Sequence, residues 1–238
     1  MDRSKSVVTP ERFQSGRTFE QYLAYIATPE NLAREGTGGS KRPDHSAVMR
    51  EWYEGSRLTD AQAAAWKWLA AQPGGPAKIL VLSEDWSSDC RRDVPMLARV
   101  AEATGMELRI FDRDGQKFGK TADPLSEPDH GKNADIMAEF MNDKNGGRWQ
   151  SIPVVVFYDK DLRFLYHYTE LPAVYHKDRV VTEKIRAPRP GESPAQTAER
   201  AGREFGAFQK APFFRLWAGA GIDEMASALH ERLVMGSL

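Results

Sequence analysis

The residues best suited to chemistry lie together at Trp86-Ser87-Ser88-Asp89-Cys90, which ends on the only cysteine of the 238-residue chain. A helix N-terminus presents unpaired backbone N–H groups and the positive end of the helix dipole, so an anion such as a thiolate is stabilised there. Cys90 is therefore a candidate redox group. Ser87 is a candidate hydroxyl donor or, more simply, a helix cap.

A strand and a helix must position this segment, and the hydrophobic pattern predicts both. Residues 79–82 form a short apolar run that is typical of a buried strand, and residues 88–103 carry a helical apolar stripe that ends before Gly105. A strand over 107–111 would complete a parallel β-α-β unit. The pattern then predicts a polar loop over 112–132, a helix over 133–141, and a hairpin of strands over 154–158 and 162–168.

Helical segments are predicted on both sides of this central region. Pro73-Gly74-Gly75-Pro76 is the clearest boundary signal in the chain. We expect a helical N-terminal extension (1–75), a core (76–171) and a helical C-terminal region (172–238) whose last helix packs on the core. The expected flanking helices cover residues 18–34, 44–53, 59–71, 172–185, 195–210 and 222–234.

Composition excludes several classes of protein. The 33 Lys and Arg residues balance 34 Asp and Glu residues, which argues against nucleic acid or an anionic membrane as partner. A single cysteine excludes a disulfide scaffold and a Cys-rich zinc site, and the five histidines show no paired ligand spacing, so we expect no metal. The first residues contain no apolar leader segment, and the longest apolar run, over 154–158, is too short to cross a membrane. We expect a cytoplasmic protein.

The order of elements between 78 and 169 resembles the thioredoxin fold, and two local signatures agree with it. The segment from Trp86 to Cys90 is similar to the Trp-Cys-x-x-Cys segment of that family, with Ser87 in place of the first cysteine. Ile152-Pro153, directly before an apolar strand, is similar to the family's cis-proline. The stretch Asp89-Cys90-Arg91-Arg92 also resembles bacterial thioredoxin-like proteins. The resemblance implies an α/β fold with a central mixed sheet and a cis-proline before the third core strand.

The same resemblance implies what the site can and cannot do. In the family the first cysteine attacks a substrate disulfide and the second resolves the mixed disulfide. Because serine is too weakly acidic for that attack, dithiol exchange is not available here. We therefore expect a protein that binds a peptide, a partner protein or a low-molecular-weight thiol, with Cys90 as its only redox group. The expected binding residues are Trp86, Ser88, Asp89, Ile152 and Pro153.

Three interpretations of this site stay open on the sequence. Cys90 is either a buried structural residue or a monothiol that forms mixed disulfides with glutathione or a partner protein, if Arg91 or Arg92 lowers its pKa. In glutathione transferases, which share the fold, a serine near this helix start donates a hydrogen bond to the glutathione thiolate, so Ser87 suggests a glutathione-dependent enzyme. The third interpretation is a non-catalytic interaction module that binds through its helical extensions.

Overall fold

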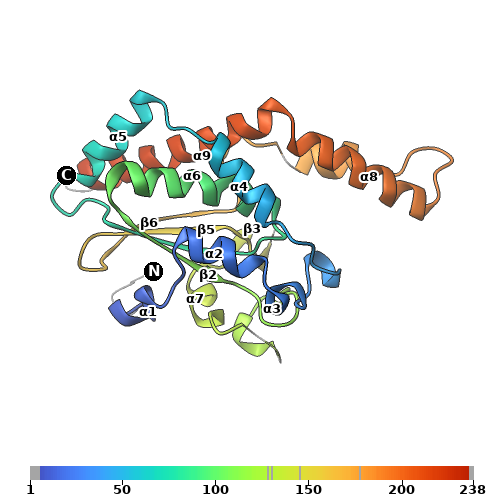
Figure 1. Ribbon diagram of the computed structural model, residues 1–238, viewed down its shortest axis with the longest axis horizontal. Helices are drawn as coiled ribbons and strands as arrows, with labels where there is room; N and C mark the ends of the chain where they lie inside the picture. The colour runs from blue at the N-terminus through green and yellow to red at the C-terminus, as the bar shows by residue number, and fades with distance from the viewer. Residues whose placement is uncertain (1–5, 128, 130, 145, 177, 236–238) are drawn as a thin grey trace.

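A four-stranded mixed sheet forms the centre of the computed structural model (Figure 1). The structure describes residues 6–127, 129, 131–144, 146–176 and 178–235. Strand β1 runs parallel to β2 and antiparallel to β5, which in turn pairs antiparallel with β6. The spatial order is β2-β1-β5-β6, and the predicted β-α-β-α-β-β sequence of elements is confirmed. The strands are β1 (Lys78–Ser83), β2 (Glu107–Asp112), β5 (Val154–Tyr158) and β6 (Phe164–Thr169).

Helices cover both faces of the sheet (Figure 1). Successive strand residues point to opposite faces, so a strand with both faces covered is apolar throughout. Ile79 and Val81 of β1 join the core that includes Cys90 and Leu97 of α6, whereas Leu80 joins a second cluster beneath the sheet. The second cluster includes residues of α1 and α7. These three helices are α6 (Ser88–Thr104), α1 (Pro10–Gln14) and α7 (Ala134–Glu139).

The N-terminal region shares the core of the sheet. Tyr22 and Ile26 of α2 and Trp52 of α4 belong to the same apolar cluster as α6. The single helix expected over 18–34 is wrong, because Thr28 caps a new helix with Pro29 in its first turn, and proline disfavours a helical conformation in the residue before it. The elements of this region are α2 (Phe19–Ile26), α3 (Pro29–Leu32), the 3-10 turn η1 (Thr37–Gly39), α4 (Ser46–Gly55) and α5 (Asp60–Ala70).

The C-terminal region departs most from the predicted elements. Residues 172–176 form turns and not the start of a helix, and a π-helical segment, η3 (Asp178–Ile185), follows. α9 (Pro212–His230) begins ten residues before the expected start at 222 because Pro212 occupies its first turn, and it packs on α6 through Ile222 and Met225. α8 (Pro194–Gln209) extends away from the sheet (Figure 1). A second π-helical segment, η4 (Glu231–Met235), ends the described chain.

Smaller differences concern turns. The loop expected over 112–132 contains a 3-10 turn, η2 (Pro124–Ser126), and a short hairpin that the pattern did not predict follows α7. β6 begins at Phe164 because Leu162 adopts a left-handed conformation, with φ of 60°, in the turn that precedes it. The unpredicted hairpin consists of β3 (Asn142–Lys144) and β4 (Gly147–Trp149). In the part of the chain that the structure describes, no helix is both long and apolar enough to cross a membrane.

Candidate functional site

Ser87 is the N-cap of α6. Its backbone is extended, and its Oγ accepts a hydrogen bond from the backbone N–H of Cys90 at 3.4 Å. This pairing satisfies one of the N–H groups that a helix start leaves unpaired, which is the usual role of a serine at this position. Only 7% of Ser87 is exposed, so the hydroxyl has little access to a molecule in solution.

Cys90 is fully buried in the core beneath the first turn of α6. Burial raises the pKa of the thiol to about 12, although hydrogen bonds with Ser83, the backbone of Glu84 and Ser87 lower it. The desolvation of a thiolate here outweighs the helix dipole that the sequence pattern brings to this position. The thiol is therefore protonated at neutral pH, and the lowered pKa that the monothiol interpretation requires is not found at this position.

Arg91 and Arg92, which were candidates to activate Cys90, are engaged elsewhere. Nη1 of Arg91 donates to the carbonyl oxygens of Asp85 and Trp86, both at 2.8 Å. Arg92 is fully buried, donates to both carboxylate oxygens of Asp93 at 2.7 Å, and pairs with Asp89 at 2.8 Å. Asp89 thus serves an ion pair inside the protein and is 1% exposed, so it does not line an open surface.

Two arginines from the N-terminal region bind the acids that precede the site, and this arrangement was not predicted. Nη1 of Arg42 lies 2.6 Å from Glu84 and 2.7 Å from Asp85, while Nη2 of Arg34 lies 2.7 Å from Glu84. Both arginines hold the pKa of Glu84 below its usual range in spite of its burial. Glu84 and Asp85 follow a buried strand in the sequence, but no sequence signal indicates that Arg42, 42 positions before Glu84, and Arg34, 50 positions before it, would pair with these acids.

Trp86 is the most exposed of the expected binding residues. It is half-buried, its Nε1 donates to Asp114 at 3.1 Å, and its ring lies 5.2 Å from that of Phe118. The long loop after β2 therefore covers one side of the tryptophan. Because Asp114 and Phe118 of this loop contact Trp86, the loop is part of the site. The sequence pattern did not predict this.

Ile152 and Pro153 lie beneath the same surface and are buried. The peptide bond between them is cis, and the Pro153 carbonyl accepts a hydrogen bond from the backbone N–H of Glu170 at 2.8 Å. Ser88 is 9% exposed. The fold thus brings the expected site residues together where β1 ends and α6 begins, but every one of them except Trp86 is buried.

His45, at the start of α4, gives the site a measurable pH response. Burial, and next the charge of Arg91, lower the pKa of His45 from 6.5 to about 4; Asp44 opposes the shift and Arg42 adds to it. The folded protein keeps the imidazole neutral while the unfolded chain takes up a proton, so stability falls as the pH drops from about 6.5 towards 4.

From pH 7 to pH 5 the free energy of unfolding should fall in both proteins, and the fall should be about 1 kcal/mol smaller in His45→Gln than in the wild type. This value is discounted for the partial exposure of the imidazole. Urea unfolding at each pH measures the difference. NMR titration of His45 checks the cause, and a midpoint near the ordinary histidine value would contradict it.

A mixed sheet, a helix that starts at the end of β1, and a cis-proline beside that start are the features of a thioredoxin-like fold. A family model described as thioredoxin matches residues 39–120. The match covers 82 of the 238 residues, among them β1, α6 and β2, and it agrees with the thioredoxin-like fold. No curated protein matches the chain.

Two solved structures are similar to the whole chain. A protein of unknown function from Pseudomonas aeruginosa has 12% sequence identity and a TM-score of 0.52, with 98% of this chain and 100% of that chain covered. At this identity the similarity shows the fold alone, and it extends over the flanking helical regions. An HIV epitope scaffold has 15% identity and a TM-score of 0.47, with 92% of this chain and 96% of that chain covered.

Proposed function

We propose that this chain is a thioredoxin-like protein that binds a partner protein or peptide and does not carry out dithiol–disulfide exchange. The observation that carries the proposal is the state of its two candidate groups. Ser87 caps α6, and Cys90 is buried with a pKa raised to about 12. Because the thiolate is the nucleophile in exchange reactions, a protonated and covered thiol is a poor redox group.

The two catalytic alternatives have less support. A monothiol that forms a mixed disulfide with glutathione or a protein needs an accessible sulfur, but Cys90 is fully buried. A glutathione-dependent enzyme needs an accessible hydroxyl at Ser87, and that residue is 7% exposed. Both alternatives require the flanking segments to move away from the start of α6, whereas binding through another surface does not.

The C-terminal helical region has the exposed apolar side chains that a binding role requires. Phe213 is 63% exposed and Leu216 is 62% exposed, one helical turn apart on α9. Large aromatic and aliphatic side chains on a surface are typical of interaction sites. This favours an interaction module that binds through its helical extension over one that binds a peptide at the half-buried Trp86.

The reactivity of Cys90 tests the proposal. We expect the native protein to react with a thiol reagent at least about a hundred times more slowly than the chain unfolded in urea, because labelling requires opening of the core. The ratio of the native rate to the unfolded rate should stay constant from about pH 6 to pH 9. The reason is that in both cases the reacting group is a solvent-exposed thiol with the usual pKa of about 8.5. Reduction of insulin should not exceed the background.

A native rate close to the unfolded rate, or a ratio that grows towards low pH, would reveal an exposed thiolate and refute the proposal. Insulin reduction at a rate similar to that of a dithiol protein would do the same. The Cys90→Ala variant is the control, because any labelling or reduction that persists in it does not come from the only cysteine.

A further inference from the structure

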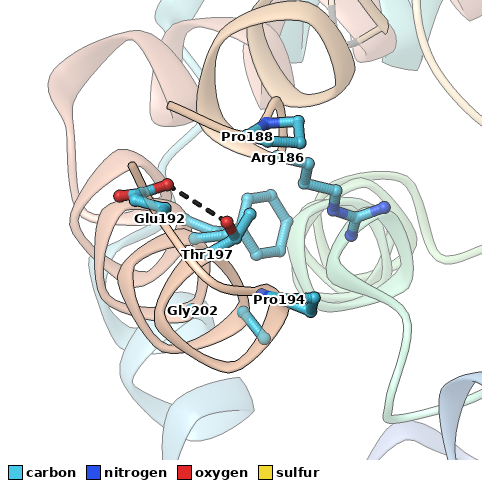
Figure 2. Close-up of a pocket in the computed structure, with 9 residues that line it drawn as sticks. Arg186, Pro188, Glu192, Pro194, Thr197 and Gly202 are labelled. Carbon is cyan, nitrogen blue, oxygen red and sulfur yellow. Dashed lines mark hydrogen bonds between the residues drawn. The ribbon is translucent and has the colours of Figure 1, made fainter. Parts of the chain in front are cut away.

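An open apolar pocket lies on the C-terminal region, between α8 and the segment that joins η3 to it; we refer to it as the α8 pocket (Figure 2). Its cavity volume is about 530 Å³, which is within the usual range for ligand sites. The pocket is far from the Cys90 site in sequence, and none of the site residues lines it. Its principal lining residues are Arg186, Pro188, Pro194, Ala198, Ala201 and Phe205.

The lining is apolar because of the composition of α8. Ala198, Ala201 and Phe205 recur at helical spacing, so they share the face of α8 that borders the pocket. α8 packs against η3 and extends beyond the sheet (Figure 1). On the face that borders the pocket, Ala198 is exposed and Ala201 and Phe205 are half-buried. The rings of Phe205 and Phe208 continue the apolar surface towards the aromatic cluster around Trp217 at the start of α9.

The two charged side chains that line the pocket, Glu192 and Arg186, differ in their pairing within the described part of the chain. Glu192 accepts two hydrogen bonds from Arg200, at 2.6 and 2.9 Å. It accepts another from Thr197 at 3.1 Å (Figure 2). These contacts hold the pKa of Glu192 at about 2, so the carboxylate is ionised at neutral pH and its charge is balanced by Arg200. Arg186, in contrast, contacts the face of the Phe205 ring at 5.6 Å, and no acidic side chain of the described residues pairs with its guanidinium.

We propose that the α8 pocket binds a segment of a partner protein in which an apolar side chain stands next to an acidic one. The apolar side chain would pack between Pro194, Ala201 and Phe205, and the carboxylate would meet Arg186 at the rim. The inference rests on the proposed binding function and names the chemistry of the partner. An open pocket favours a protein segment because a small ligand gains most of its affinity when nearly all its surface is buried.

The experiment selects peptides from a random library displayed on phage, with the full-length wild-type protein as target. The key variant is Ala201→Trp, which fills the pocket, and the matched control is Ala207→Trp, on the exposed side of the same helix and outside the pocket. We expect the selected peptides to combine an apolar and an acidic residue. They should bind Ala201→Trp at least about ten times more weakly than wild type and bind Ala207→Trp normally.

Arg186 provides a second, independent variant that does not depend on the folding of Ala201→Trp. A charge pair at an exposed rim contributes little, so Arg186→Gln should weaken peptide binding about two- to fivefold, and Arg186→Glu should weaken it further. The inference would be overturned if no sequence-specific peptide is recovered, or if the recovered peptides lack acidic residues. It would also be overturned if substitutions at Arg186 and Ala201 leave peptide binding unchanged. These outcomes are separate from a failure of the proposed function, which would be seen as reactivity of Cys90.

Discussion

Replacing Arg42 by methionine is expected to lower the free energy of unfolding by about 3–5 kcal/mol, because the change leaves two buried carboxylates without their shared cation. Arg42 lies 2.6 Å from Glu84 and 2.7 Å from Asp85, and its side chain is fully buried. Without it, Glu84 keeps Arg34, but among the described residues the carboxylate of Asp85 keeps a single hydrogen bond, from Asn31 at 3.3 Å.

Asp85 makes this loss severe. Its second carboxylate oxygen is already buried without a hydrogen-bond partner among the described residues, and burial raises the pKa of the carboxyl above its usual range. Removing the cation increases the cost of keeping this group ionised in the core. Arg42 also donates to the carbonyl of Glu35 at 2.7 Å, so the loop between α3 and α4 loses its anchor as well.

Urea unfolding of the Arg42→Met variant and the wild type measures this effect. The matched control is Arg50→Met on α4, whose ion pair with Glu20 has an N–O distance of 3.7 Å and a side chain that is 53% exposed. We expect that control to change stability by less than about 1 kcal/mol. An Arg42→Met variant as stable as the control would show that the network does not hold the N-terminal region in place.

Replacing Arg92 by methionine should cost a similar 3–5 kcal/mol for the same reason, because Arg92 is the buried cation shared by Asp89 and Asp93 of α6. The guanidinium donates to both oxygens of Asp93 and to Asp89, and it lies 5.1 Å from the centre of the Tyr175 ring and 5.7 Å from that of Phe214. A cation over aromatic faces adds to the charge pairs. Arg92 thus connects the central helix with the C-terminal region.

The position of Arg92 also predicts which region of the Arg92→Met variant should unfold first. Tyr175 stacks on Trp217 at 4.1 Å, so loosening the contact with Arg92 should loosen the C-terminal region first. We expect limited proteolysis to cleave the C-terminal region, beyond residue 170, faster in the variant than in the wild type, along with the loss of stability in urea. Arg203→Met, on the exposed side of α8, is the control and should change neither measurement appreciably. A variant that resists the protease as the wild type does would contradict this role.

Much of the fold is predictable from the sequence because its signals are local. The apolar run of β1, the capping serine at 87 and Gly105 in its left-handed conformation fix the strand, the start of α6 and its end. Two of the wrongly predicted helix boundaries also have local signals, but the prediction followed the apolar periodicity instead. Thr28-Pro29 starts a new helix inside the expected one, and Pro212 starts α9 well before its apolar stripe.

The site is less predictable because its properties depend on contacts between distant segments. Neither Arg34 nor Arg42 is in a motif, and each reaches Glu84 only after the N-terminal region folds onto the end of β1. The loop that carries Asp114 and Phe118 covers Trp86 in the same way. No pattern in the sequence specifies such pairings.

The sequence by itself determined that this protein has one cysteine, so the chain has no second thiol for dithiol exchange within itself, and its resemblance to thioredoxins predicts serine in the attacking position. Only the tertiary structure decided what became of the remaining thiol. Helix position alone favours a reactive Cys90, because the dipole acts locally. Burial opposes it and prevails, since helices from both ends of the chain complete the core around the sulfur and remove the water that a thiolate needs.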